Sequence, residues 1–328
     1  MTVAQVKERK GSRLRAGTHA LSLLAAPINV AVLEALADGP KALMDLRHAA
    51  GGPSQSTLRL RLRELTELGV LIRGRQEGFP RALDYELAEP GRDLLAVMGF
   101  VRAWLEQSPS GPIEIGTPPA KGMVKSLIEG WTSTVVRALA AKPLTLTELD
   151  RLISGLNYPS LERRLGTMHH CGQVERLPSR GRGTPYTVTR WLRQGIAPLA
   201  AAARWERQHA AETTAPVARL DVEAGFLLIV PLVTLPRELS GECRLAVETP
   251  GGGERRMAGI KVGIDAGRVV SRVTNLEGHA DAWASGSVSD WLRALIEHDR
   301  AGLEIGGDTL LAGELVDALH GMVFAAGN

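Results

Sequence analysis

The sequence predicts a multi-domain α+β protein: two tandem helical units, each closed by a β-hairpin, followed by a third unit in which strands precede helices. Three observations lead to this prediction. Residues 20–106 and 123–207 repeat each other, mostly at an offset of 103. In both copies, helical spacing of apolar residues gives way to two short strand-like runs. After Leu220 the pattern becomes strand-like, and two amphipathic stretches follow.

The repeat falls on apolar and glycine positions, which set cores and turns. It pairs Gly69 with Gly172. After a hairpin tip that is two residues shorter, the offset becomes 101, so that Trp104 pairs with Trp205. Further pairs are Leu24 with Leu127, Pro40 with Pro143, Leu62 with Leu165 and Tyr85 with Tyr186. We infer that one unit was duplicated, and two copies make a tandem pair rather than a solenoid.

Composition and charge indicate a globular protein whose first two-thirds are basic. Of 328 residues, 44% are hydrophobic and 23% are charged, which are ordinary globular values. Residues 1–110 carry a net charge of +3 and residues 111–214 one of +6, whereas residues 215–328 carry −6. A basic block attracts polyanions, although a solvated surface with scattered charge explains the numbers equally well. Aromatic residues make up only 4%, which argues against base stacking as the main activity.

Stretches rich in Pro, Gly, Ser and Thr at 107–119 and 211–217 divide the chain into expected domains over 12–108, 120–210 and 217–328. In the first domain we expect helices over 20–26, 28–37, 41–50 and 54–69, strands over 70–73 and 84–88, and a last helix that carries Trp104. The second domain repeats this order, and Thr145 with Glu148 forms a capping box at one helix start. A helix-turn-helix followed by a hairpin is the winged-helix arrangement, in which the helix before the hairpin fits the DNA major groove.

The candidate DNA-contacting residues of the first unit lie on the helix predicted over 54–69. Arg59 and Arg63 project away from its leucine stripe and are therefore placed to contact phosphates and base edges. The alternative is an exposed face that holds ion pairs such as Arg63 with Glu67. Ser54 either caps the helix or contacts a phosphate. The full candidate set on this helix is Ser54, Gln55, Ser56, Thr57, Arg59 and Arg63.

The matching helix of the second unit and the two hairpins complete the candidate DNA-binding set. The second helix offers Asn157, Tyr158, Ser160 and Arg163, but Gly166 stands at the position of Arg63, so base contact by this helix stays open. In the hairpins, the candidates for phosphate contact are Arg73, Arg75, Arg81, Arg180 and Arg182. The alternative for these arginines is a solvated loop.

Residues 53–65 (PSQSTLRLRLREL) and 69–73 (GVLIR) resemble the recognition-helix segment of the HxlR family of bacterial regulators. Residues 79–81 (FPR), residues 84–87 (DYEL) and Gly91 resemble that family's returning wing strand and the start of its next helix. The resemblance covers residues 20–106 well and residues 123–207 more weakly. It implies a cytoplasmic transcription regulator that binds double-stranded DNA as a homodimer with two reading heads. The duplication would place both heads in one chain, spaced by about 34 Å or a multiple of it, and would favour an imperfect repeat as the binding site.

Two further positions coincide between the copies. Arg164 matches Arg61 on the helix that precedes the hairpin, and Glu148 matches Asp45 on the helix before it. We therefore hypothesise that Arg61 with Asp45, and Arg164 with Glu148, form structural ion pairs that lock these helices together.

In the last third, the apolar run 226–233 and the alternating runs 244–248, 257–264 and 268–274 predict strands, and residues 287–298 and 308–322 predict amphipathic helices. The stretch 282–292, followed by 303–308 (LEIGGD), is similar to sterol-carrier-protein-type domains. That resemblance implies an α+β layer with an apolar tunnel for a small apolar molecule, lined by Trp291, Leu295, Leu311 and Leu315. The alternatives are an ordinary core or a dimerisation domain.

We expect no enzyme, cofactor, metal or membrane association. The sequence shows no paired nucleophile and base, no set of metal ligands and no cofactor loop, and its longest apolar run is too short to span a bilayer. Cys171 and Cys243 form no disulfide framework, which is typical of a reducing cytoplasm. Two alternatives to DNA binding remain: a protein-interaction module built on winged helices, and a carrier of hydrophobic ligands.

Overall fold

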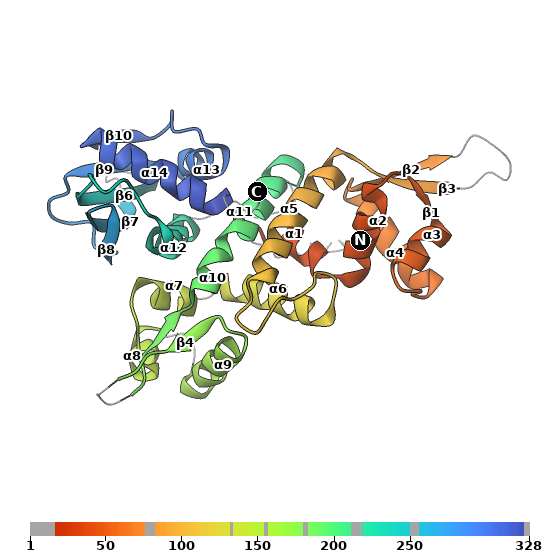
Figure 1. Cartoon of the computed structure of the whole chain (residues 1–328), viewed down its shortest axis with the longest axis horizontal. Helices are drawn as coiled ribbons and strands as arrows, with labels where there is room; N and C mark the ends of the chain where they lie inside the picture. The colour runs from red at the N-terminus through yellow and green to blue at the C-terminus, as the bar shows by residue number, and fades with distance from the viewer. Residues whose placement is uncertain are drawn as a thin grey trace, which may run out of the picture.

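The computed structural model describes residues 17–75, 83–131, 134–153, 157–179, 183–210, 217, 219–249 and 256–324. The elements form a first unit over residues 18–106, a second unit over residues 118–209 and a C-terminal unit over residues 219–324. In Figure 1 the first unit lies at the right, the second at the lower left and the C-terminal unit at the upper left, around a centre made of helices from the first two units.

The first unit is a winged helix-turn-helix, as the sequence predicts. Three strands form a sheet in the order β1-β3-β2, in which β2 and β3 make the antiparallel wing. The elements are α1 (Thr18–Leu24), α2 (Pro27–Ala37), β1 (Lys41–Ala42), α3 (Leu43–Ala49), α4 (Gln55–Glu67), β2 (Leu71–Arg75), β3 (Leu83–Leu87) and α5 (Glu89–Glu106).

The second unit follows a similar order, but an isolated bridge between Leu144 and Tyr186 takes the place of β1, and two helices, α10 and α11, follow its hairpin. Gly69 and Gly172, which the repeat pairs, both adopt a φ of +70° just after the helix that precedes the hairpin, and glycine takes this left-handed conformation without strain. The capping box of Thr145 and Glu148 is confirmed at the start of α8. The elements are α6 (Pro118–Trp131), α7 (Thr134–Ala141), α8 (Leu146–Leu152), α9 (Tyr158–His170), β4 (Val174–Arg176), β5 (Tyr186–Val188), α10 (Arg190–Gln194) and α11 (Ile196–His209).

A pair of stacked tryptophans joins the first two units. The rings of Trp104 on α5 and Trp191 on α10 lie 4.4 Å apart between centroids, with planes 3° apart. Each indole N–H donates to the backbone carbonyl of the other residue, at 3.0 Å from Trp104 and 2.8 Å from Trp191. Both side chains are almost fully buried. Because these buried N–H groups are satisfied across the junction, the two units are held in a defined arrangement.

Helix α11 extends this junction along α5 and α1. Trp205 on α11 donates its indole N–H to the carbonyl of Pro90 at 2.7 Å. The buried carboxylate of Glu206 accepts from the backbone N–H groups of Gly17 at 2.6 Å and Ala20 at 2.9 Å, so it satisfies donors at the start of α1. One helix of the second unit therefore anchors two helices of the first.

The C-terminal unit is a five-stranded sheet with helices on one face. The strand order is β10-β9-β6-β7-β8, and only β6 and β9 pair in parallel. Helices α12 and α14 pack on the sheet, and α13 packs against α14. The elements are α12 (Arg219–Ile229), the 3-10 turn η1 (Val230–Leu232), β6 (Gly241–Thr249), β7 (Arg256–Asp265), β8 (Arg268–Val273), β9 (Ala282–Gly286), α13 (Val288–Glu297), β10 (Glu304–Gly307) and α14 (Thr309–Phe324).

The prediction of a strand over residues 226–233 is wrong. This run completes α12 and the 3-10 turn. Phe226, Leu227 and Val230 have no exposed surface, because the helix lies between the sheet and the second unit. An apolar run that is buried on all sides has no amphipathic period, so its sequence cannot distinguish a helix from a buried strand.

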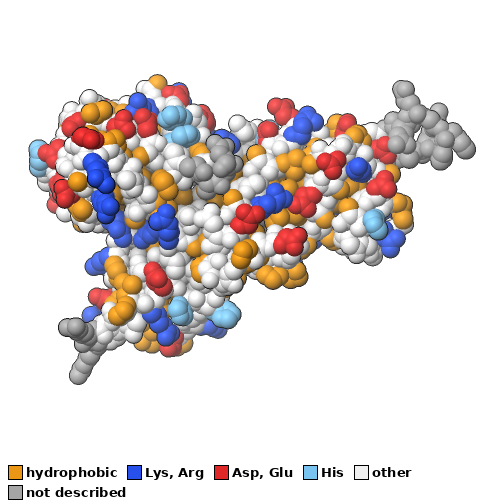
Figure 2. Space-filling view, in the orientation of Figure 1, with side chains coloured by type: hydrophobic (Ala, Val, Ile, Leu, Met, Phe, Trp, Pro, Cys, Tyr) orange, Lys and Arg blue, Asp and Glu red, His pale blue; other side chains and the backbone are white. Residues whose placement is uncertain are grey.

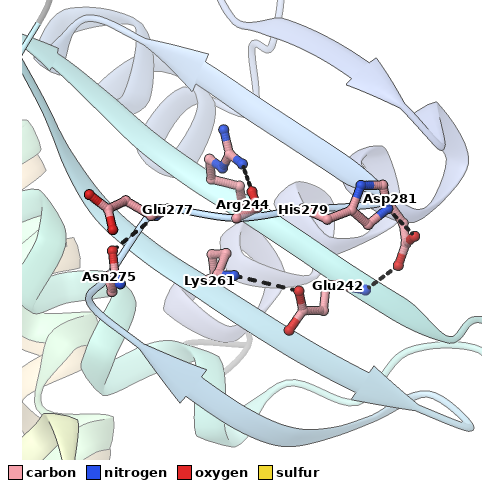
Figure 3. A network of polar contacts seen from close by, with 8 residues as sticks. Glu242, Arg244, Lys261, Asn275, Glu277, His279 and Asp281 are labelled. Atoms are coloured by element: carbon pink, nitrogen blue, oxygen red, sulfur yellow. Dashed lines mark hydrogen bonds and ion pairs between the residues drawn. The ribbon is translucent and has the colours of Figure 1, made fainter.

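A polar loop lies over the other face of the sheet (Figure 3). Arg244 on β6 donates to the carbonyl of Gly278 at 2.7 Å, and the backbone N–H of Glu242 donates to Asp281 at 2.7 Å. This backbone hydrogen bond, with one from His279, lowers the pKa of the Asp281 carboxyl. Lys261 on β7 lies 3.6 Å from Glu242. The face of the sheet opposite the helices therefore carries polar contacts rather than a second apolar core.

The C-terminal unit is attached to the second unit through buried and half-buried charges. Arg137 on α7 pairs with the buried Glu223 on α12 at 2.5 Å. The buried guanidinium of Arg193 donates to the carbonyl of Leu227 at 2.7 Å, and burial, with the positive charge of Arg272 nearby, lowers the pKa of Arg193 to about 10. Arg272 itself donates to Ala140 of α7 at 3.3 Å. Figure 2 shows Lys and Arg side chains gathered where these two units meet.

Among the described residues, no single helix is long and apolar enough to cross a membrane, although α1 and α2, bent by 83°, pass that test as a pair.

Candidate nucleic-acid interface

Helix α4 presents a polar face to solvent because its apolar residues all lie on the opposite side. Leu58, Leu62 and Leu65 are fully buried at spacings of four and three residues. Ser54 caps the helix by accepting the backbone N–H of Thr57 at 3.1 Å, so the capping role expected for this serine is present. All of the predicted contact residues on the helix remain exposed with the three units in place: Gln55, Ser56, Thr57, Arg59 and Arg63.

The arginines of α4 differ in their surroundings. Arg63 lies 3.5 Å from Glu67, and both side chains are more than 60% exposed, so this ion pair contributes little and opens readily. Arg59 has no ion-pair partner among the described residues. The alternative interpretation of this face as a set of surface ion pairs thus fits Arg63 but not Arg59, which is available for an external anion.

The hypothesis of two ion pairs between neighbouring helices is wrong. Arg61 pairs with Glu64, one turn along its own helix, at 2.8 Å. Arg164 donates to the backbone carbonyl of Glu129 at 2.9 Å. Glu148 is held in its capping box, where hydrogen bonds from Thr145 lower the pKa of its carboxyl. Arg61 and Glu148 are thus taken up by partners within one turn of their own helices, which need no fixed distance between two helices. Arg164 does reach a second helix, but its partner is a backbone carbonyl of α6 rather than the carboxylate of Glu148.

In the wing of the first unit, Arg73 lies over the ring of Tyr85, 5.7 Å from its centroid. These two residues face each other in the register of β2 and β3. Arg75 ends β2 opposite Leu83. Arg81 lies outside the described residues. Arg73 is exposed, so its guanidinium is held over the ring and still reaches solvent at the base of the wing.

The second unit repeats this contact with a residue that our sequence analysis missed. Arg176 lies over the ring of Tyr186 at 5.5 Å, and the two face each other in the register of β4 and β5. Arg176 stands 103 residues after Arg73, so the repeat itself would have found it. Arg180 and Arg182, predicted at the hairpin tip, lie outside the described residues.

Helix α9 is exposed in the same way as α4, with different side chains. Asn157 caps it by accepting the backbone N–H of Ser160 at 3.0 Å. Tyr158 is 44% exposed and Arg163 is exposed, whereas Leu161 and Leu165 are buried beneath them. Asn157 therefore replaces Ser54 as the cap, and Tyr158 is a large side chain where α4 has Gln55.

The comparisons with known proteins concern the first unit. Residues 24–110 match the model of the HxlR family, an HxlR-like helix-turn-helix. This unit is accordingly similar to the helix-turn-helix of transcription regulators. No curated protein matches the chain. Two solved structures that match are the diamide-treated YodB from B. subtilis and a protein described as a "Putitive Transcriptional Regulator of MarR Family" from Enterococcus faecalis V583.

The two structures overlap a limited part of the chain. The YodB structure is 33% identical, with 27% of this chain and 87% of that chain covered and a TM-score of 0.25. The Enterococcus structure is 24% identical, with 31% of this chain and 90% of that chain covered and a TM-score of 0.26.

The residues predicted to line a ligand tunnel lie in two different places. Trp291, Leu311 and Leu315 have no exposed surface; Trp291 donates its indole N–H to the carbonyl of Ala246 at 2.8 Å and packs edge-on against Phe226. Leu295 lines a pocket at the junction between the C-terminal unit and α11. The first three residues thus occupy the core of the C-terminal unit, and Leu295 alone of the four reaches this pocket.

Proposed function

We propose that the chain is a DNA-binding transcription regulator whose first and second units are two winged-helix reading heads on one chain. The observation that carries the proposal is the exposed, capped face of α4 with Arg59 and Arg63, in the unit that matches the HxlR family. Arginine favours bidentate contact with phosphate and guanine, and a capped helix start is suited to base edges in the major groove.

The second head is supported by the matching local structure of α9 and its hairpin. The cap at Asn157 and the contact of Arg176 with Tyr186 are counterparts of the cap at Ser54 and the contact of Arg73 with Tyr85. Because α4 and α9 carry different exposed residues, the preferred site is an imperfect repeat. The C-terminal unit, for which we retain the sterol-carrier-like assignment, takes no part in DNA contact in this proposal, and no catalytic step is assigned to the chain.

The decisive experiment is duplex binding by the full chain, measured by fluorescence anisotropy over a range of salt concentrations. We expect binding that weakens steeply with salt, because Lys and Arg release counterions from phosphates. Selection from a random duplex library would then give the site. Binding that is absent, or insensitive to salt, would refute the proposal.

One observation favours a second candidate, a protein-interaction module. Leu60 on α4 is 45% exposed and Met44 on α3 is 56% exposed, and Gln55 lies beside Met44. Exposed apolar side chains on a recognition surface suit a protein partner better than a phosphate backbone. Salt-insensitive capture of a protein, with no affinity for any duplex, would favour this candidate.

A further inference from the structure

An apolar pocket opens between the C-terminal unit and the second unit. One wall is α11, which contributes Ile196 and Leu199; the other walls come from α12, α13 and α14. Among its described lining residues, Asp221 is the one charged side chain, and the other side chains are aliphatic. The pocket thus differs from the predicted tunnel, since Trp291, Leu311 and Leu315 lie in the core of the C-terminal unit.

The chemistry of the lining defines what the pocket accepts. The described walls carry no aromatic ring that could stack on a planar ligand, so an aliphatic chain is the best complement. The described walls offer no basic side chain to an anionic head group, and burying a carboxylate without a partner is costly. An uncharged head group, such as an alcohol, meets both conditions.

The size of the pocket links its occupancy to the arrangement of the units. Its cavity volume is about 70 Å³, well below the roughly 300 Å³ or more of typical small-molecule sites. A ligand with a long chain therefore fits only if the C-terminal unit moves away from α11. A ligand that binds better to the opened arrangement shifts the population toward it.

Helix α11 also holds the two heads together. Its first residues line the pocket, while Trp205 and Glu206 near its end bind Pro90 and the start of α1 in the first unit. Arg193, just before α11, binds Leu227 of the C-terminal unit. Opening the pocket thus acts on a helix that contacts both of the other units.

We propose that this pocket binds a small aliphatic molecule with an uncharged head group, and that its occupancy weakens DNA binding. The coupling to DNA rests on the proposed function of the two heads, whereas ligand binding to the pocket does not.

Gly225 offers a matched pair of variants. A Cβ atom added there meets only the end of Ile196, at 4.0 Å, so Gly225→Ala fits without movement. A larger side chain at the same position extends into the pocket, which Gly225 lines. Gly225→Leu therefore blocks the pocket, and Gly225→Ala is its control. Both substitutions favour the helical backbone of α12, so loss of helix is not a cause of any difference.

The experiment is calorimetric titration of the full chain with 1-decanol and with decanoate, followed by duplex anisotropy with and without 1-decanol. We expect 1-decanol to bind saturably to the wild type and to Gly225→Ala, and to bind Gly225→Leu at least tenfold more weakly. We expect decanoate to bind each of the three proteins more weakly than 1-decanol does. We also expect 1-decanol to raise the duplex Kd at least threefold in the wild type and Gly225→Ala, and not in Gly225→Leu.

The outcomes separate the two proposals. If Gly225→Leu and Gly225→Ala bind 1-decanol equally, or if no variant binds it, the pocket is not the ligand site. If decanoate binds as tightly as 1-decanol, the assignment of an uncharged head group is wrong. An unchanged or lower duplex Kd with 1-decanol bound would overturn the coupling. A chain that binds 1-decanol as expected but no duplex would refute the proposed function and the coupling, and would leave the pocket supported.

Discussion

The indole N–H of Trp205 donates to the backbone carbonyl of Pro90, and this hydrogen bond corresponds, position for position in the sequence repeat, to the one from Trp104 to Trp191. The two donors, Trp104 and Trp205, are 101 residues apart, and so are the two acceptors, Pro90 and Trp191. In one hydrogen bond the first unit supplies the donor and the second unit the acceptor, and in the other these roles are reversed. Reciprocal contacts of this kind are the mark of a twofold interface, in which residue i contacts j and j contacts i. The first two units therefore meet within one chain in the manner of two subunits of a symmetric dimer.

The first prediction concerns the recognition face of α4. We expect Arg59→Ala with Arg63→Ala to weaken duplex binding by roughly 30-fold or more, because each lost contact to a base or phosphate costs about 1–3 kcal/mol. Anisotropy titration at physiological salt measures the change. Arg102→Ala, on α5 and paired with Glu34, is the control and should bind as the wild type does. Equal affinity of the double variant and the control would reject this face.

A second prediction concerns the number of heads. Arg163→Ala with Arg176→Ala removes one exposed arginine from α9 and one from its hairpin. If the second unit contacts DNA, these changes should weaken binding roughly tenfold and lower the salt dependence by about two phosphate contacts. The slope of log Kd against log salt gives the readout. A slope equal to that of the wild type would mean that only the first unit contacts DNA.

A third prediction concerns the tryptophan junction. Trp104→Phe removes the indole ring's five-membered part and its N–H donor, so the buried carbonyl of Trp191 keeps only the longer bond from the backbone N–H of Gly195, at 3.2 Å. We expect a loss of roughly 1–3 kcal/mol in the free energy of unfolding, measured by urea denaturation. Trp283→Phe, at a ring that is 39% exposed, serves as the control and should change stability by less. A junction that contributes nothing would show equal losses in both variants.

The fourth prediction concerns the pH dependence of stability. Burial raises the pKa of the Glu206 carboxyl above its ordinary value of 4.5, although hydrogen bonds from the start of α1 lower it in part. The folded chain therefore binds more protons than the unfolded chain between these two pKa values. The contribution of this carboxyl to stability is then fully present below pH 4.5 and is lost as the pH rises through the folded-state pKa.

The variant Glu206→Gln tests this sign, because its side chain does not titrate. The Tm of the variant minus that of the wild type should become more positive as the pH rises from about 4 to 7. Thermal melts at matched ionic strength give the difference. A difference that becomes more negative over this range would contradict the raised pKa.

A fifth prediction concerns thiol reactivity. Burial, with the negative charge of Asp308 nearby, raises the pKa of the Cys243 thiol to about 12, and the side chain has no exposed surface. Because the thiolate is the reactive form, iodoacetamide at pH 8 should label the half-buried Cys171 first and Cys243 only after unfolding. Peptide mass spectrometry separates the two sites. Labelling of Cys243 in the folded chain as fast as in the unfolded chain would disprove this assignment.

The sequence predicts local structure well where one face is buried and the other is exposed. The leucine spacing of α4, the cap at Ser54 and the box of Thr145 with Glu148 follow from rules that act within one turn of helix. The strand expected over 226–233 fails because a fully buried helix has no polar side to set its period. The pairs expected for Arg61 and Arg164 fail because the repeat shows which positions match, and not which atoms meet.

The contacts between units escape sequence analysis for a different reason. The repeat pairs Trp104 with Trp205, yet Trp104 stacks on Trp191, which matches a proline in the first copy. Two matching residues need not touch when the copies are related by a twofold exchange. The pocket at α11 is likewise formed by residues between 196 and 229 together with residues between 292 and 323, and no local spacing indicates it.

The C-terminal unit is a single copy: its contacts through Arg137 and Arg193 are with the second unit, and Phe324 meets Phe100 of the first unit edge-on. A single unit attached in this way removes the twofold symmetry that the tryptophan junction creates. A rotation about the approximate twofold axis between the first two units exchanges α4 and α9, but it moves the C-terminal unit to the opposite side. Once seated on a double helix, such a chain would point along it in one direction, with its acidic unit facing either upstream or downstream. A symmetric homodimer has no such polarity, whereas this chain joins two unlike units to a single appendage.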